Sequence, residues 1–330
     1  MRKLLLAFET SCDETCAAVL ECRMQNAECR IKVLSNVISS QIEIHKLYGG
    51  VVPEIASRNH VLAIQTVYEE ALRQAGVTLD DITQIAATTH PGLRGAVMVG
   101  QVFAESLAVA SKKPFIEVNH LAGHIASVSL RGDCHVASRS SQQAPQFHGN
   151  PEPPFLTLLV SGGHTSLYKV TAWDNIELLC ETADDAVGEA FDKVAKLLGL
   201  GYPGGPAIAK EAEKYQGKDF IQFVNKPNKK DGFSYSGLKT AVLNYLQKNK
   251  DFNVARLAAS FQHEAIMQLV DKCKSEMKRH NIETLCVCGG VAANKYLREH
   301  LPFAYFPAME YCTDNAAMIG AAAVLGVFID

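Results

Sequence analysis

The sequence uses one plan twice. A short apolar run, a turn of small polar residues and a second apolar run occupy residues 3–22 and again 155–170. Apolar runs of this length, bounded by turns, indicate buried strands. The second copy repeats the pattern and not the residue identities. Because helical apolar patterns follow both copies, we expect an α/β protein in which strands and helices form packed layers.

The length of the chain indicates two domains. At 330 residues it exceeds what one hydrophobic core usually supports. We expect a first domain at 1–130, a linker or insertion at 131–154, and a second domain at 155–330 whose last helix packs back on the first domain. The middle segment is rich in Ser, Gln, Pro, His and Asn and has no periodicity, which is typical of an exposed connection.

Periodicity and turn residues place further elements between the two copies of the plan. Residues 53–75 carry apolar side chains at a helical period, and Gly76 is expected to end that helix. The other expected elements are strands at 31–38, 84–89, 114–118 and 284–288, helices at 96–110, 183–198, 254–280 and 316–328, and a tight loop at 202–206 that leads into a helix.

Two histidines, His120 and His124, stand four residues apart just after the apolar run 114–118. On a helix, residues at this spacing share one face, so both imidazoles can bind one divalent metal ion. The pair is expected where a strand gives way to a helix, which is a common place for a site in an open α/β sheet. The alternative is two partly exposed histidines on a surface helix.

Asp314 is the candidate for a third ligand. It precedes the last apolar helix, and we expect it at a strand-to-helix turn, as for His120. Its structural alternative is the N-cap of that helix, and the two roles are compatible. Two imidazoles and one carboxylate leave positions open for substrate oxygens.

Three polar turns, at residues 9–15, 161–165 and 289–294, each follow a predicted strand. Glycine lets backbone N–H groups approach phosphate oxygens, and a helix beginning near Gly289 would add further donors. Together the turns predict a nucleotide cleft. Asp192 and Asn294 are either polar anchors for a ligand or, respectively, a helix-surface charge and a turn residue.

Several classes of protein are excluded or disfavoured. The ten cysteines include no CxxC pair, which indicates reduced thiols and a cytosolic type of compartment. No run of 18 apolar residues predicts a membrane helix, and acidic residues interrupt the N-terminal apolar run too early for a signal peptide. We therefore expect a cytoplasmic protein without a membrane partner. The net charge of −3 gives no global indication of nucleic-acid binding, although a local basic patch would suffice.

Nine motifs stand in order along nearly the whole chain. They are 8–15 (FETSCDET), 49–54 (GGVVPE), 119–124 (NHLAGH), 161–165 (SGGHT), 188–193 (GEAFDK), 202–206 (YPGGP), 233–240 (FSYSGLKT), 289–294 (GGVAAN) and 312–315 (CTDN). Together they resemble the TsaD family of tRNA threonylcarbamoyladenosine transferases, once labelled O-sialoglycoprotein endopeptidases. His164, after Ser-Gly-Gly, resembles the bacterial and organellar branch of that family.

The resemblance implies an actin-like ATPase fold with two related lobes. It implies one divalent metal, Fe²⁺ in the first place and Zn²⁺ as the alternative, bound by His120, His124 and Asp314. Leu159 stands where the archaeal branch has a metal-binding tyrosine, so no fourth protein ligand is expected.

The resemblance also implies a reaction. The threonylcarbamoyl group passes from threonylcarbamoyl-AMP to N6 of adenosine 37 in tRNAs that read codons starting with A, and ATP or ADP can occupy the same cleft. Asp13 and Glu14 are the candidate catalytic carboxylates that accept the N6 proton; their alternative role is to orient the waters of the metal or to cap the turn. The expected substrate-binding residues are Leu159, Val160, Ser161, Gly162, Gly163, Asp192, Gly205 and Asn294.

The implied partners are tRNA, a paralogous actin-like subunit of the TsaB type and a small P-loop ATPase of the TsaE type. The expected helix 53–75 is our candidate for the contact with the paralogous subunit. Two departures affect the expected cleft rim and partner surfaces: the connection 131–154 is long, and the chain after Asn294 is short.

Three other functions are weaker. A metalloprotease of the HExxH type has Glu after the first His, where this chain has Leu121, which cannot take a proton. A sugar or acyl kinase of the same fold needs a base for a hydroxyl group, and paired histidines are not a usual Mg²⁺ site. A scaffold without activity would not need the full set of metal and turn residues.

Overall fold

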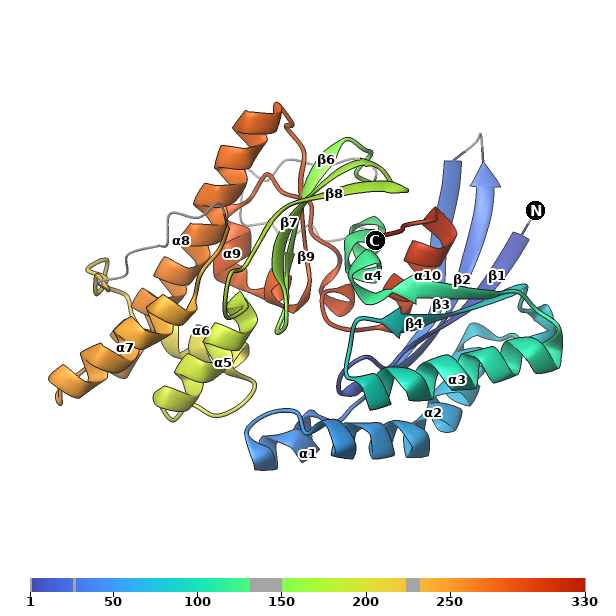
Figure 1. Cartoon of the computed structure of the whole chain (residues 1–330), viewed down its shortest axis with the longest axis horizontal. Coiled ribbons are helices and arrows are strands. Elements are labelled where there is room, and N and C mark those ends of the chain that lie inside the picture. Colours follow the sequence, from blue (N-terminus) through green and yellow to red (C-terminus); the bar gives the residue numbers. More distant parts are fainter. Residues whose placement is uncertain (1, 26–27, 131–149, 224–231, 330) are drawn as a thin grey trace. The chain divides into compact units, whose positions relative to one another are not determined.

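The protein is described here by a computed structural model that covers residues 2–25, 28–130, 150–223 and 232–329 (Figure 1). It divides into two compact units. The first comprises Met1–His135, Thr171–Ile176 and Pro307–Asp330, and the second comprises Val136–Val170 and Glu177–Phe306. Most of the expected connection 131–154 lies outside the described residues, and the expected domain boundaries stay a prediction.

The first unit is built on a five-stranded mixed sheet in the order β3-β2-β1-β4-β5. The antiparallel strands β1, β2 and β3 form one half, and β4 and β5 run parallel to β1. Side chains along β1 alternate between two cores, Leu5 and Ala7 in one and Leu6 and Phe8 in the other, so both faces of the sheet are covered. The strands are β1 (Arg2–Glu9), β2 (Glu14–Gln25), β3 (Glu28–Ser40), β4 (Gln84–His90) and β5 (Phe115–Asn119).

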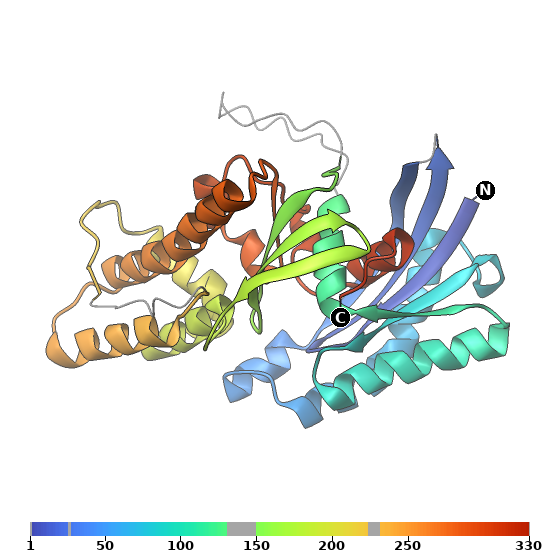
Figure 2. The same cartoon turned by 45° about the horizontal axis from the view of Figure 1, so that its top comes forward.

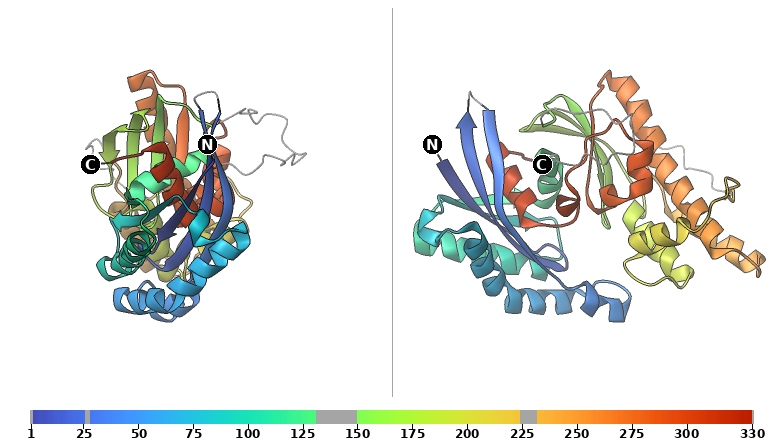
Figure 3. Two further views of the ribbon diagram at one scale, coloured as in Figure 1. Left: turned by 90° about the vertical axis from the view of Figure 1, so that its right-hand side faces the viewer. Right: turned by 180° about the vertical axis from the view of Figure 1, so that it is seen from behind.

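Helices cover the two faces of this sheet in pairs (Figures 2 and 3). The long helices α2 (Pro53–Ala75) and α3 (Arg94–Ser111) pack on the face of Leu6 and Phe8. On the opposite face lie α4 (His120–Ala126) and α10 (Ala316–Leu325). A short helix, α1 (Ile42–His45), links β3 to α2.

Helix α4 packs against α10 with Gly123 at the contact. A Cβ atom at Gly123 would lie 2.6 Å from Cδ1 of Ile319, so that side chain would have to shift. The lack of a side chain at Gly123 leaves room for Ile319. Because α10 packs on α4, the residues just before α10 come next to the start of α4.

The second unit contains a four-stranded sheet in the order β8-β7-β6-β9, in which β6 pairs antiparallel with β7 and parallel with β9. Its strands are β6 (Phe155–Val160), β7 (Thr165–Ala172), β8 (Asn175–Glu181) and β9 (Leu285–Cys288). Its helices are α5 (Val187–Leu197), α6 (Gly204–Ala212), α7 (Ser236–Lys248), α8 (Val254–His280) and α9 (Lys295–His300).

The α/β class is confirmed, and so are the bounds predicted for α2 and α8. Pro53 begins α2 and Gly76, at φ 66°, ends it, as such residues usually do. The predicted last helix is too long, because Gly326 at φ 67° stops α10 at Leu325. No helix in the described part of the chain is long and apolar enough to cross a membrane.

Three other predictions about elements need correction. The helix expected at 183–198 begins at Val187, because the Thr182 hydroxyl donates to Asp185 O and holds the preceding residues in a turn. The expected loop 202–206 already contains the first turn of α6. The turn after β9 is a short 3₁₀ helix, Gly290–Ala293, which separates Gly289 from α9. Strand β8 and helix α7 were not predicted.

Candidate functional site

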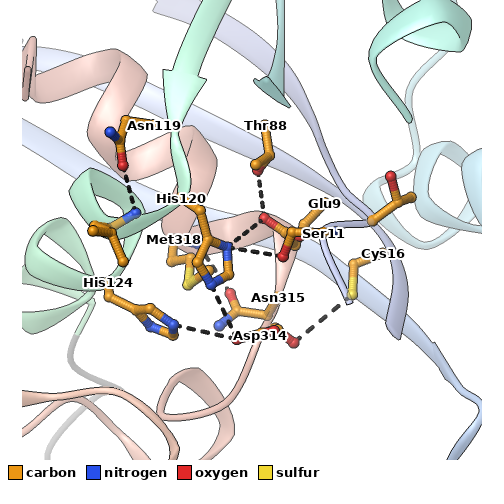
Figure 4. A network of polar contacts seen from close by, with 12 residues as sticks. Glu9, Ser11, Cys16, Thr88, Asn119, His120, His124, Asp314, Asn315 and Met318 are labelled. Atoms are coloured by element: carbon orange, nitrogen blue, oxygen red, sulfur yellow. Dashed lines mark hydrogen bonds and ion pairs between the residues drawn. The ribbon is translucent and has the colours of Figure 1, made fainter. Parts of the chain in front are cut away.

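The two histidines of the HxxxH motif lie at the start of α4, directly after β5 (Figure 4). The Asn119 side chain caps the helix by accepting hydrogen bonds from the N–H groups of Leu121 and Ala122. The ring centroids of His120 and His124 are 4.6 Å apart, and the His124 side chain is fully buried. The prediction of a strand-to-helix junction is confirmed, and the alternative of a surface helix with exposed histidines is wrong.

Asp314 comes to the same place from the C-terminal end of the first unit. Its Oδ1 lies 3.2 Å from Nε2 of His124 and 3.6 Å from Nε2 of His120. The expected strand before it is wrong, because the 3₁₀ helix Met309–Tyr311 stands there. The N-cap of α10 is Asn315, so the Asp314 carboxylate is left to face the histidines.

These three residues fit a divalent metal. Their donor atoms all lie within 4.8 Å of one another. Tetrahedral ligands about 2.1 Å from an ion are about 3.4 Å apart, which matches the separations between the Asp314 carboxylate and the two rings. Among the described residues, Nδ1 of the buried His124 has no hydrogen-bond partner, and its Nε2 faces the Asp314 carboxylate. Since a buried polar atom without a partner is costly, this ring is suited to bind an ion.

Charge at the site also favours a cation. Burial lowers the pKa of His120, but the carboxylates of Asp314 and Glu9 outweigh it and raise the pKa to about 9. Burial lowers the pKa of His124, despite its contact with Asp314. The carboxylates of Asp314 and Glu9, which favour a charged His120, would also favour a metal ion at this place.

Glu9 is a site residue that sequence reasoning missed. It ends β1, its side chain is 1% exposed, and its Oε2 lies 3.0 Å from Nδ1 of His120. Burial raises its pKa, but His120 outweighs this and leaves the pKa lowered. A glutamate directly after the buried apolar run 4–8 was the available signal, because a buried carboxylate requires partners.

Asp13 and Glu14 stand on the turn between β1 and β2 and at the start of β2, in the same unit. The pKa of Glu14 is raised well above its usual value by burial and by the nearby charges of Asp314 and Asp13, to which it also hydrogen-bonds. The turn is held from α2, where Nε2 of His60 lies 3.0 Å from the carbonyl of Cys12. The carboxylates therefore lie within electrostatic reach of the candidate metal ligands.

The turn predicted to bind phosphate lies in the second unit, after β6. Ser161 closes it: its N–H donates to His164 O at 2.8 Å, and its hydroxyl accepts from the N–H groups of Gly163 and His164. Nothing lies within 4 Å of a Cβ built on Gly162 or Gly163, so the turn is open. Leu159 and Val160 are fully buried in β6, so a ligand role for them stays a prediction.

The remaining predicted substrate residues also lie in the second unit, and the side chains of two of them make hydrogen bonds within it. Asp192 accepts a hydrogen bond from the N–H of Gly204 at 2.6 Å, next to the open position Gly205. Asn294 is the N-cap of α9, and its amide group donates to Gln262 at 3.0 Å. The turn role weighed for Asn294 is thus present, and a ligand role stays a prediction.

The chain is similar to a family of known proteins over most of its length. The family model described as "TsaD: tRNA N6-adenosine threonylcarbamoyltransferase" matches residues 32–321. A relative of that name from Clostridium perfringens is 47% identical and covers 98% of this chain and 92% of its own length. Relatives of the same name from Clostridium novyi and Caldicellulosiruptor bescii are 46% and 45% identical, over 97% and 96% of this chain and 91% of their own lengths.

Solved structures are similar in fold. Full-length HypF in its phosphate- and nucleotide-bound form has a TM-score of 0.59 at 15% sequence identity, covering 98% of this chain and 46% of that chain. HypF from T. kodakarensis has a TM-score of 0.60 at 14% identity, covering 98% and 48% of the two chains. At such low identity the likeness concerns the fold alone, and it agrees with the expected actin-like ATPase class.

Proposed function

The chain belongs to the TsaD family of tRNA N6-adenosine threonylcarbamoyltransferases, and from this premise we propose that His120, His124 and Asp314 form its metal centre. The enzyme transfers the threonylcarbamoyl group of threonylcarbamoyl-AMP to N6 of adenosine 37 in tRNAs that read codons beginning with A. The observation that carries the metal proposal is the cluster of two buried imidazoles and one half-buried carboxylate, whose donor atoms all lie within 4.8 Å of one another.

The donor set of the cluster suits Fe²⁺, with Zn²⁺ as the alternative, because imidazole nitrogen and carboxylate oxygen bind both ions well. When bound, such an ion supplies a Lewis acid for an oxygen of the reacting group. His120 and His124 stand on α4, which packs against α10 in the core of the first unit.

The nucleotide part of the substrate is assigned to the second unit. The open turn at Ser161, Gly162 and Gly163 offers backbone N–H groups to the phosphate, which would help AMP to leave. Asp192, Gly205 and Asn294 are proposed for the nucleoside, and Leu159 and Val160, at the end of β6, are proposed to place the turn that follows them. ATP or ADP would bind to the same groups.

The proton of the attacking amine needs an acceptor. As N6 of adenosine forms its bond to the carbamoyl carbon, the bond from that carbon to the AMP phosphate oxygen breaks and N6 releases a proton. Asp13 and Glu14 lie close to each other and to Asp314, and one of these two carboxylates is our candidate acceptor. N6 is a weak nucleophile, so positioning of the two substrates should supply much of the rate.

The enzyme is proposed to work with partners. Besides tRNA, these are a paralogous actin-like subunit of the TsaB type and a small P-loop ATPase of the TsaE type. The outer surface of α2 exposes Val61 and Leu62, and that of α3 exposes Val102 and Val109. Exposed apolar patches of this kind mark protein interfaces, so we assign the paralogous subunit to α2 and α3. A cytoplasmic location is part of this proposal, because the acceptor is tRNA.

The test in cells is nucleoside analysis of tRNA after depletion of this protein. Loss of threonylcarbamoyladenosine, restored by the wild-type chain and by His90→Ala but not by His124→Ala, is the expected result. His90 is an exposed histidine on the same unit and serves as the matched control. Full restoration by His124→Ala would contradict the metal centre, and an unchanged level of the modified nucleoside after depletion would contradict the function itself.

A further inference from the structure

The Glu9 carboxylate is surrounded by hydrogen-bond donors (Figure 4). Its Oε1 accepts from the N–H of Ser11, and its Oε2 accepts from the hydroxyl of Thr88. The same Oε2 lies 3.0 Å from Nδ1 of His120, and Oγ of Ser11 lies 3.1 Å from that nitrogen. The Glu9 side chain is buried, so its carboxylate interacts with these protein groups and not with solvent.

We propose that Glu9 is a positioning residue of the metal centre, which keeps a proton on Nδ1 of His120 and thereby presents Nε2 to the ion. The inference rests on the proposed function in one respect only, the binding of a metal by the cluster. It assigns a task to a residue outside the ligand set.

The direction of the hydrogen bond follows from the chemistry of the two groups. An ionised carboxylate can only accept, so the ring must donate from Nδ1. In a neutral imidazole the other nitrogen then carries the lone pair, and here this is Nε2, which faces Asp314 Oδ1 at 3.6 Å. A carboxylate behind a metal-binding histidine fixes the ring orientation and makes the ligand nitrogen more basic.

His124 shows what His120 would lack without Glu9. Among the described residues no group hydrogen-bonds to Nδ1 of His124, so its ring is oriented by packing and by the contact of Nε2 with Asp314. The pair therefore consists of one ring with a carboxylate behind its Nδ1 and one ring without such a group. Removal of Glu9 should affect metal affinity through His120 only, and should leave a weakened site instead of none.

The variant that isolates this role is Glu9→Gln. Glutamine has the same shape but only one acceptor oxygen, and its NH₂ group would face a donor from Ser11, Thr88 or His120. The ring is then pushed to accept at Nδ1 and to carry its proton on Nε2, toward the ion. Glu21→Gln is the matched control, since Glu21 is a buried carboxylate on β2 that pairs with Arg23 and does not touch His120.

The experiment measures the Zn²⁺ dissociation constant of the full chain by competition with a chelator, with thermal unfolding of the metal-free protein as a check. We expect Glu9→Gln to bind Zn²⁺ about 10- to 100-fold more weakly than the wild type, and Glu21→Gln to bind it equally well. Equal affinity of folded Glu9→Gln and wild type would overturn the proposal.

A second measurement needs no variant and covers the case in which Glu9→Gln does not fold. Nitrogen-15 NMR of the zinc-loaded wild type should show His120 bound through Nε2 with a proton on Nδ1. Binding through Nδ1 would overturn the role of Glu9 while leaving the metal site intact. A wild-type chain that takes up no zinc would overturn the metal centre itself, and the role of Glu9 with it.

Discussion

Nε2 of His124 lies 3.2 Å from the Asp314 carboxylate, and Nδ1 of this buried ring has no hydrogen-bond partner in the described part of the chain. The two residues come from distant segments, the start of α4 and the residue before the N-cap of α10. A buried polar atom without a partner costs about 1–3 kcal/mol, and an ion shared by the two residues would offset part of such a cost.

Metal content tests this arrangement directly. Because His124 supplies one of three ligands, His124→Ala should reduce bound iron or zinc from one ion per wild-type chain to a small fraction of that value. His90→Ala, which removes an exposed histidine of the same unit, should keep the full content. The measurement is elemental analysis of purified protein, and equal stoichiometry in His124→Ala and wild type would contradict the ligand assignment.

The subunit contact can be tested on α2. The Leu62 side chain is 79% exposed, so Leu62→Glu should leave the fold intact while placing a charge in the proposed apolar interface. We expect the dissociation constant for the paralogous subunit to rise at least tenfold. Leu178→Glu changes an exposed leucine on β8, in the other unit, and should not alter it. Equal binding by both variants in a titration would place the contact elsewhere.

Asp184 joins the loop after β8 to the start of α7. Its carboxylate accepts from the N–H groups of Tyr235 and Ser236 and from the hydroxyls of Ser234 and Ser236. Asp184→Ala should lower the free energy of unfolding by about 1 kcal/mol, the usual cost of losing a helix cap. Asp251→Ala, at an exposed acid before α8, should change it much less. Equal losses in urea unfolding would show that Asp184 is not a cap.

The same network gives a pH dependence with a defined sign. The hydrogen bonds to Asp184 outweigh burial and lower its pKa below the usual 3.8. As pH falls through 3.8 and then through the lowered value, the unfolded chain takes up this proton first, and the stabilisation is lost. Urea unfolding of the wild type and Asp184→Ala should therefore converge at low pH, and a constant difference down to acid pH would contradict the assignment.

His60 is charged when protonated, unlike Asp184, and should make the stability of the protein depend on pH near neutrality. It is buried beneath the turn of Asp13, with Nδ1 2.8 Å from the Thr15 hydroxyl, and burial lowers its pKa below 6.5. Between the lowered value and 6.5 the unfolded chain binds more protons, so the wild type should lose stability as pH falls below 6.5.

The matched variants for this prediction are His60→Gln and His90→Gln. His60→Gln removes the titrating group while keeping a donor and an acceptor, so the loss of stability between pH 7 and pH 5 should become smaller. His90→Gln changes an exposed histidine and should follow the wild type. If denaturant unfolding gives the same pH slope for His60→Gln and wild type, the neutral buried state of His60 is wrong.

Local patterns were sufficient to predict some parts of the molecule and not others. The bounds of α2 and α8 follow from a helical apolar period with Pro53, Gly76 and similar end residues, which are all local signals. The residues of β8 are exposed or half-buried in no regular alternation, and the strand has no clear apolar face, so its sequence carries no strand signal. The α/β class was predictable because most strands are apolar and bounded by turns.

The candidate site shows the same division. His120 and His124 share a helix face, so their proximity is a local property. Their proximity to Asp314 depends on the packing of α10 on α4, which no spacing reveals. Glu9 was missed because its role depends on β1 lying beside β4 and α4, where Thr88 and His120 become its partners.

The central claim is that the metal centre acts in the transfer step, and a single-turnover assay tests it most directly. Threonylcarbamoyl-AMP, tRNA and the partner proteins are mixed with the wild-type chain, with the metal-stripped chain or with Asp314→Ala, and formation of the modified adenosine is followed. Because a Lewis acid contributes several kcal/mol to such a step, the stripped chain and Asp314→Ala should react about 100-fold more slowly or worse. An unchanged transfer rate in the metal-stripped chain would show that the His120, His124 and Asp314 cluster is structural and that the assignment of the catalytic centre is wrong.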